Sequence, residues 1–217
     1  MIDFLKKILY LFLIKNSYSQ DGEDIFLIRY FKNIKNGFYV DLGCHHPKRF
    51  SNTYLLYKKG WNGINVDANN STILLFNLFR KRDKNINALI NTKSESVFYY
   101  RFNDSALNGI LSIRNVQKLL DVGYKVVKKV KMNSIFINDF LEKNELVDKK
   151  INFLKIDLEG IDFDIIKALD FTILNIDVIM IEKQQNKLKE DELKLYLKNK
   201  SYKFIFESNR NLVFSSL

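Results

Sequence analysis

The chain alternates short runs of β-branched and aromatic residues with longer stretches whose apolar residues recur at helical spacing. We expect strands at 38–42, 63–68, 86–90, 97–102, 125–131, 152–157, 177–182, 203–207 and 212–215. We expect helices at 22–32, 53–59, 71–81, 109–122, 137–143, 163–169 and 190–198. This alternation is typical of an α/β protein whose mostly parallel sheet is covered by helices on both faces.

Two features refine this expected fold. The last two predicted strands are joined by the polar residues 208–211, which predicts a hairpin and therefore an antiparallel last strand. Dinucleotide-binding sheets are usually all parallel, so this ending argues against that class. The strands at 97–102 and 125–131 flank a helix, which indicates an insertion at about 95–135 between the third and fourth core strands. Such an insertion could form a wall of a substrate site.

A single domain is expected over 18–217, because no Pro-, Gly- or Ser-rich stretch offers a linker. Residues 1–17 precede it as an apolar, amphipathic helix. The apolar part, 1–14, is too short to span a bilayer as a helix. It is expected to dock on the domain, on a second copy of the chain in a homodimer, or peripherally on the inner face of a membrane.

The formal net charge of +10 favours phosphate groups, whether on nucleic acids, nucleotide-linked sugars or lipids. The lysines are scattered rather than gathered in one block with interleaved aromatic residues, which argues against nucleic acid as a partner. The lone Cys44 cannot form an internal disulfide, and no signal-peptide cleavage site follows the apolar N-terminus. We therefore expect a cytoplasmic protein.

Polar residues end the first two core strands, where an open parallel sheet binds its ligands. Asp41 and Gly43 end the first strand, and a glycine lets a ligand approach the backbone closely. Asp67 ends the second, where a carboxylate accepts hydrogen bonds from both hydroxyls of a ribose. A dinucleotide site needs G-x-G-x-x-G, but bulky His45 and His46 follow Gly43. A ligand with a ribose and without a pyrophosphate fits better.

Two later strand ends also carry acids. Asp157 and Glu159 could hold a cation or supply a general base, or could only brace the loop. Glu182 could face a substrate or pair with a lysine. His45 and His46 are adjacent and point in different directions, so at most one is expected to face a ligand. The absence of H-x-x-x-H and C-x-x-C spacing predicts no metal site, although Asp157 could recruit a divalent ion.

Five blocks of sequence resemble the FkbM-type methyltransferases in order and spacing. They are YSQDGED at 18–24, GFYVDLGCHHP at 37–47, SNTYLLY at 51–57, GWNGINVDA at 60–68 and LKIDLEG at 154–160. The likeness covers roughly residues 18–183. It implies a class I methyltransferase fold, a Rossmann-like doubly wound sheet that is mostly parallel with an antiparallel C-terminal hairpin strand. It also implies an O-methyltransferase that uses S-adenosyl-L-methionine.

The resemblance assigns roles to individual positions. The residues it places around the cofactor are Gln20, Gly22, Glu23, Asp24, Asp41, Gly43, His45, Asn52, Asp67 and Ala68. The candidates for the catalytic base are His46, His45, Asp157 and Glu159. A histidine ranks first because its ordinary pKa lies nearest the working pH. The family's fourth motif commonly reads Glu-Gly-His/Tyr-Glu, whereas Gly160 is followed here by Ile161 and Asp162, which removes one candidate base.

The resemblance implies methyl transfer to a hydroxyl of a sugar or glycan-type acceptor, and we expect this to take place in the surface polysaccharide biosynthesis of a bacterium. The acceptor is expected to be a small molecule or a glycan rather than a nucleic acid. One alternative is a non-catalytic scaffold of the same fold, which the altered residues Ile161 and Asp162 keep open. Another is an NAD-dependent or nucleotide-sugar enzyme, against which the missing glycine fingerprint and the terminal hairpin argue.

Overall fold

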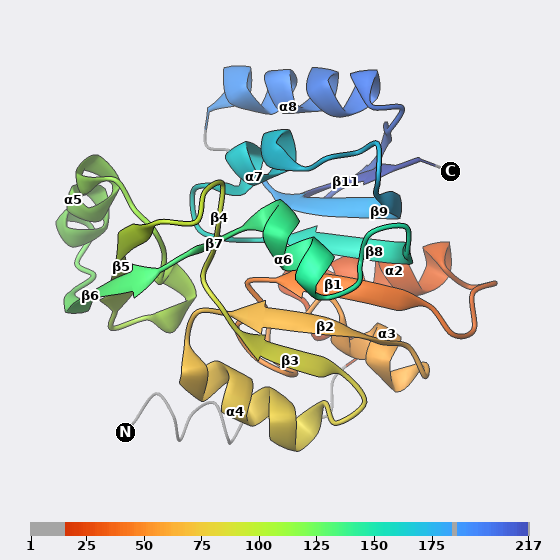
Figure 1. The fold of residues 1–217 in the computed structure, drawn as a ribbon, viewed down its shortest axis with the longest axis horizontal. Coiled ribbons are helices and arrows are strands. Elements are labelled where there is room, and N and C mark those ends of the chain that lie inside the picture. Colours follow the sequence, from red (N-terminus) through yellow and green to blue (C-terminus); the bar gives the residue numbers. More distant parts are fainter. Residues whose placement is uncertain (1–15, 184–185, 217) are drawn as a thin grey trace.

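The computed structural model describes residues 16–183 and 186–216, and the helix expected over 1–14 lies outside them. Its centre is a seven-stranded sheet in the order β3-β2-β1-β8-β9-β11-β10 (Figure 1). These strands are β1 (Phe38–Leu42), β2 (Asn62–Asp67), β3 (Lys84–Asn87), β8 (Lys150–Ile156), β9 (Asn175–Glu182), β10 (Lys203–Glu207) and β11 (Asn211–Ser215). Neighbouring strands are parallel except where β11 pairs antiparallel with β9 and β10. The expected fold class and its antiparallel C-terminal hairpin are confirmed.

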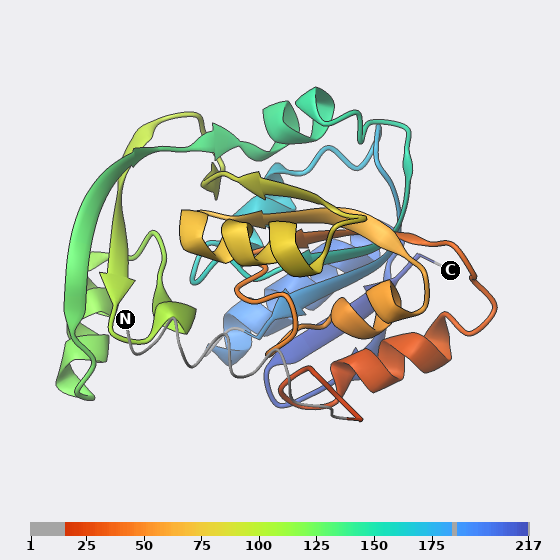
Figure 2. The same cartoon turned by 90° about the horizontal axis from the view of Figure 1, so that it is seen from below.

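Helices cover both faces of this sheet. They are α2 (Glu23–Tyr30), α3 (Tyr54–Lys58), α4 (Asn70–Phe79), α6 (Ile137–Lys143), α7 (Asp162–Ala168) and α8 (Lys187–Asn199). Successive residues of a strand point to opposite faces, so Val40 and Leu42 pack with α6, α7 and α8, whereas Tyr39 packs with α2 and α3. Figure 2 shows α6 and α2 on opposite sides of the sheet. The apolar core therefore has two layers, and the strand ends stay open to solvent.

A separate unit is inserted between β3 and β8. Its strands β5 (Ser96–Phe102) and β6 (Val126–Asn133) pair antiparallel with each other and not with the central sheet. The chain between them forms the short helix η1 (Ser105–Leu107) and the helix α5 (Ile113–Asp121). Both views place this insertion beyond one end of the central sheet (Figures 1 and 2). That end carries the residues that follow the parallel strands.

The strand predicted at 86–90 is wrong in its second half. The edge strand β3 ends before Ala88, whose N–H makes the last hydrogen bond of the ladder with β2, to the carbonyl oxygen of Asp67. The next residues form the short strand β4 (Ile90–Asn91), which pairs with β7 (Ile135–Phe136) at the base of the insertion. Pairing with a distant segment, rather than local hydrophobicity, decides where this strand stops.

The helix predicted at 109–122 starts later than expected, at the first residue of α5. Gly109 is held instead by two backbone hydrogen bonds with Tyr100 of β5, at 3.0 and 3.2 Å. Ser112 then caps the helix, because its side chain accepts a hydrogen bond from the N–H of Asn115. The residues before this cap are therefore not part of the helix, and they form a turn near the carboxyl ends of the parallel strands.

Candidate active site

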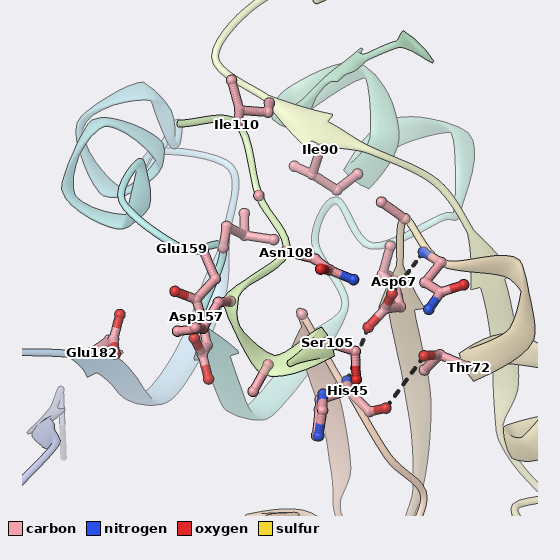
Figure 3. A pocket seen from close by; sticks show the side chains of 18 of the residues that line it. His45, Asp67, Thr72, Ile90, Ser105, Asn108, Ile110, Asp157, Glu159 and Glu182 are labelled. Carbon is pink, nitrogen blue, oxygen red and sulfur yellow. Dashed lines mark hydrogen bonds between the residues drawn. The ribbon is translucent and has the colours of Figure 1, made fainter. Parts of the chain in front are cut away.

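A cavity of about 360 Å³ lies outside the carboxyl ends of the parallel strands. Residues that follow β1, β2, β8 and β9 line it, together with residues of the insertion. We call it the strand-end cavity. Figure 3 shows Asp157, Glu159 and Glu182 on one side of it and Asp67 and Thr72 on the other. This is the position in which open α/β sheets bind their ligands.

Asp67 stands at the tip of β2, and backbone donors set the orientation of its carboxylate. The N–H of Asn69 donates to Oδ1 at 2.7 Å, and the N–H of His45 donates to Oδ2 at 3.0 Å. An ionised carboxylate has about four acceptor positions, so this orientation is compatible with hydroxyl donors from a ligand. Residues 88–90 add an apolar surface to the same cavity. A carboxylate and an apolar wall together suit a ribose that carries a flat ring.

Lys155 connects the ends of β1 and β8 below the cavity. Its Nζ donates to the carbonyl oxygen of Gly43 at 3.0 Å, and lies 3.1 Å from Asp157 Oδ2 and 3.4 Å from Asp41 Oδ1. Burial alone would lower the pKa of Lys155, but the charges of Asp157 and Asp41 outweigh burial and raise it. The ammonium therefore stays charged and compensates two acids at the centre of the site.

Three further carboxyl groups near Asp157 have raised pKa values. Burial raises the pKa of Glu159, and the negative charge of Asp157 raises it further. The same two causes, burial first, raise the pKa of Glu182. Burial and Asp157 also raise the pKa of Asp162, to about 6. Carboxyl groups in a cavity whose pKa is strongly perturbed by burial and by a neighbouring charge are candidates for proton transfer.

The insertion forms the remaining wall of the cavity. The turn at 104–110 lines it together with Tyr99 and Tyr124. Gly109 in this turn lies against the loop after β8, because a Cβ built on Gly109 would be 2.7 Å from the Cβ of Glu159. A glycine is what permits this close approach. The insertion and the loop after β8 thus lie against each other on the side of the cavity that carries Asp157 and Glu159.

The structure separates the residues predicted from sequence into two groups. Those that line the strand-end cavity are Gln20, Gly43, His45, Asp67, Ala68, Asp157 and Glu159. Those that do not line it are Gly22, Glu23, Asp24, Asp41, His46 and Asn52. The strand ends chosen from sequence do meet at one place, but spacing did not distinguish side chains that face the cavity from those behind it.

His46 is the clearest correction among the candidate bases. It is fully buried outside the cavity lining, and its Nδ1 accepts hydrogen bonds from the N–H groups of Lys48 at 3.0 Å and Arg49 at 2.8 Å. These bonds orient the imidazole ring toward the backbone of its own loop, away from the cavity in which a methyl acceptor would bind. His45 lines the cavity instead, on a backbone with φ of 54°. Only one of the two adjacent histidines faces a ligand site, as their adjacency predicted.

Asp41 and Asn52 lie behind the cavity and support it. Asp41 is 1% exposed, accepts a hydrogen bond from Thr53 Oγ1 at 2.9 Å and pairs with Lys155. Asn52 is buried, and its Nδ2 donates to the sulfur of Met180. Both side chains link neighbouring segments of the chain, and neither lines the cavity in which the resemblance places the cofactor.

The two acids at the start of α2 likewise make their hydrogen bonds within the protein. Glu23 is fully buried, and its Oε1 accepts hydrogen bonds from Ser208 Oγ at 2.6 Å and Asn211 Nδ2 at 2.7 Å. Asp24 accepts hydrogen bonds from the segment just before it. Gly22 turns the chain into α2 with φ of 84°. These contacts fix this segment on the terminal hairpin, beside the cavity.

Two parts of the site were missed in the sequence. Lys155 was not singled out, although a lysine between Leu154 and Ile156 in an apolar strand is a signal of a buried and paired charge. The turn at 104–110 carries no motif, and nothing local indicates that it folds back over the sheet. Its role follows only from the pairing of β5 with β6.

Metal ligands do not gather in the part of the chain that the structure describes. Within residues 16–183 and 186–216, no three His, Cys, Asp or Glu side chains come close enough to hold a metal ion. Asp157, which the sequence analysis considered for a divalent ion, pairs with the ammonium of Lys155. In the same ranges, no helix has both the length and the apolar character needed to cross a membrane.

Comparison with known proteins identifies the family. No curated protein matches the chain with statistical significance. Among solved structures, it is similar to the Pyrococcus horikoshii protein PH1948, described as an RNA methyltransferase, with 11% identity, 96% of each chain covered and a TM-score of 0.46, too low to bear on function. The methyltransferase FkbM domain matches residues 41–204, which run from within β1 to the start of β10 and include most of the residues that line the strand-end cavity. The chain therefore belongs to the FkbM methyltransferase family and is a methyltransferase, a class whose general methyl donor is S-adenosylmethionine.

Proposed function

We propose that this methyltransferase transfers a methyl group to a hydroxyl oxygen of a sugar or glycan-type acceptor in surface polysaccharide biosynthesis. The strand-end cavity is the observation that supports this most, because Asp67 lies across it from Glu159 and Glu182 (Figure 3). The first side suits a cofactor, and the second suits a hydroxyl that has to lose a proton. We place the reaction in the cytoplasm, in keeping with a chain whose one cysteine is free.

The residues present fit S-adenosylmethionine. The Asp67 carboxylate, oriented by two backbone N–H groups, would hold the ribose hydroxyls, and the apolar residues 88–90 would lie along the adenine. The glycine at position 43 keeps the first strand end free of a side chain where the cofactor approaches. When bound there, the cofactor supplies an electrophilic methyl group. The residues of the insertion exclude water from the space in front of it.

Glu159 is the base that we propose. The acceptor oxygen would form its bond to the methyl carbon as the bond between that carbon and sulfur breaks, S-adenosylhomocysteine would leave with the electron pair of the broken bond, and the proton of the hydroxyl would pass to the Glu159 carboxylate. Burial and the charge of Asp157 raise the pKa of Glu159 to about 10, so only a small ionised fraction acts as the base at neutral pH, but this fraction is a stronger base than an ordinary glutamate. Asp157 is less suited because Lys155 pairs with it. His45 lines the cavity and is the second candidate.

A divalent ion does not fit the residues present, so we assign the metal no role. The Asp157 carboxylate, the one considered for it, is 3.1 Å from the Lys155 ammonium, which would repel a cation. In the described ranges no set of three ligands accompanies it. Proton transfer and positioning by side chains therefore account for the proposed chemistry.

The cofactor site is tested by thermal unfolding of the full chain with S-adenosylhomocysteine and, separately, with NAD. A ligand that binds only the folded state raises the midpoint, so we expect a rise with S-adenosylhomocysteine and none with NAD. Asp67→Asn keeps the size of the side chain but loses its charge, and we expect at least a tenfold loss of affinity, about 1.4 kcal/mol. An unchanged midpoint with S-adenosylhomocysteine would contradict the proposed site.

The acceptor class is tested by transfer of a labelled methyl group to a panel of sugars, nucleotide sugars and bacterial glycans. The product expected is a methyl ether, so the label should stay on the acceptor after mild alkali, which cleaves methyl esters. Label that alkali releases would instead indicate a carboxyl acceptor. Label on RNA, with none on any sugar, would contradict a glycan-type acceptor.

A further inference from the structure

A second cavity, of about 600 Å³, lies next to the first. It runs between α5 of the insertion and four residues on the other side, Glu182, Lys183, Asn186 and Lys189. The two cavities share Leu107, Glu159 and Glu182 in their linings, so they meet at the acidic wall. We call this second space the α5 cavity. A molecule in it would reach the carboxylate that we propose as the base.

Basic side chains line the α5 cavity from both sides. Arg114 and Lys118 lie one turn apart on α5, and Lys183 and Lys189 come from the opposite side. Lys183 pairs with Glu207. Within the described ranges, the side chains of the other three make no ion pair or hydrogen bond. Three cationic groups without an acidic partner thus converge on one cavity.

The charges in this cavity are separated along its length. Glu159 and Glu182 lie where it meets the strand-end cavity, and Leu111 and Leu119 add apolar surface on the α5 side. The cations line the remainder, and the shared carboxylates have raised pKa values, which reduces their repulsion of an anion. A ligand that fits this distribution has a hydroxyl at one end and an anionic group at the other.

We infer that the α5 cavity binds an acceptor that carries a phosphate or diphosphate ester, with its phosphate against Arg114, Lys118 and Lys189. This inference rests on the proposed function, since it assumes that methyl transfer takes place at the shared wall. An arginine guanidinium donates hydrogen bonds to two phosphate oxygens at once, whereas a lysine ammonium attracts phosphate as a point charge. The substrate class is therefore a phosphorylated sugar or a sugar linked to a nucleoside diphosphate, held by its phosphate while its hydroxyl reaches Glu159.

A nucleic acid fits this cavity less well. Single-stranded chains bind along basic grooves in which aromatic side chains stack on successive bases. The described lining of the α5 cavity holds leucines, asparagines, a glycine and charged residues, and no aromatic side chain. A compact phosphate ester, bound at the cationic end of this cavity, matches these residues better than a polymer.

The test measures binding of glucose 1-phosphate and of pyrophosphate to the full chain saturated with S-adenosylhomocysteine, by calorimetry. Glucose is the uncharged control ligand. We expect both phosphate compounds to bind and glucose not to bind. The double variant Arg114→Glu with Lys118→Glu should weaken the phosphate compounds at least about tenfold, because two charge-assisted contacts are reversed. Its affinity for S-adenosylhomocysteine should be unchanged.

Lys128→Glu with Lys131→Glu is the matched control, since both lysines are exposed on β6 of the same insertion and outside the α5 cavity. It makes the same charge change and should bind the phosphate compounds as the unmodified chain does. Equal losses in the two double variants would overturn the inference, and so would phosphate binding that survives Arg114→Glu with Lys118→Glu. The inference would also be overturned if the chain bound RNA but neither of the small phosphate compounds, and if Arg114→Glu with Lys118→Glu, but not the control variant, lost the RNA binding. Failure of S-adenosylhomocysteine to bind would instead contradict the proposed function, whatever the phosphates do.

Discussion

The backbone of Gly43 touches the carbonyl oxygen of Asp157, so closely that a Cβ built on Gly43 would lie 1.8 Å from that oxygen. The contact joins the end of β1 to the end of β8 at the floor of the strand-end cavity. Gly43 also has φ of 79°, a conformation that side chains other than glycine adopt at a cost. Two independent constraints therefore require a glycine at this position.

Gly43→Ala is expected to destabilise the protein by more than about 3 kcal/mol, because the added Cβ meets rigid backbone and φ is unfavourable. Gly60→Ala is the matched control. Gly60 has φ of 94° but nothing within 4 Å of a built Cβ, so only the conformational cost of about 1 kcal/mol remains. Denaturant unfolding of both variants measures the difference. Equal losses would show that the close approach to Asp157 does not matter.

Lys155→Met is expected to cost about 3–5 kcal/mol of unfolding free energy, because it leaves the buried Asp41 without its cation and Asp157 without its partner. Lys167→Met is the control. Lys167 and Glu192 form an ion pair with side chains 42% and 56% exposed, for which we expect a loss below about 1 kcal/mol. If the two variants unfold at the same denaturant concentration, the ammonium of Lys155 does not hold the strand ends together.

Glu159→Gln is expected to lower the rate of methyl transfer at least about 100-fold while leaving the affinity for S-adenosylhomocysteine unchanged. The base acts only when ionised, so the rate of the unmodified enzyme should increase with pH until the raised pKa of Glu159 is passed. The variant should lack this increase. Glu142→Gln, at an exposed position on α6, is the control and should keep both rate and profile. A pH profile that survives in Glu159→Gln would point to His45.

Asp162 gives a prediction about stability. Its Oδ1 accepts a hydrogen bond from the N–H of Leu158 at 2.6 Å and its Oδ2 one from the N–H of Gly160 at 3.2 Å, yet burial and Asp157 raise its pKa from the usual 3.8 to about 6. The folded state binds the proton of the Asp162 carboxyl group more tightly than the unfolded state does. The contribution of Asp162 to the unfolding free energy is therefore complete below pH 4 and is lost as the pH rises to about 6.

As the pH rises from below 4 to about 6, the unfolding free energy should therefore fall by up to about 3 kcal/mol more in the unmodified chain than in Asp162→Asn. Unfolding at several pH values measures this difference. Asp170→Asn is the control. Hydrogen bonds from Thr172 lower the pKa of the exposed Asp170, so its contribution to stability should be lost as the pH falls rather than as it rises. A constant difference between the unmodified chain and Asp162→Asn would contradict the raised pKa.

The sequence was sufficient for the fold class, because period-two patterns are local. Runs of β-branched and aromatic residues predicted the core strands, and the turn at 208–211 predicted the hairpin. The strand ends at Asp67 and Asp157 were also found correctly, since parallel strands bring their carboxyl ends to one edge. What failed were the limits of two elements, where pairing with distant residues overrode the local pattern.

By itself, then, the sequence determined an α/β methyltransferase fold of the FkbM type and the edge of the sheet at which its ligands bind. The tertiary structure alone decided which acids face the cavity, that Lys155 compensates Asp41 and Asp157, and that His46 turns inward. It also decided that the turn around Gly109 closes over Glu159. The reason is physical: local periodicity sets the direction of a side chain along its own element, whereas its neighbours, its burial and its pKa depend on segments far away in the chain.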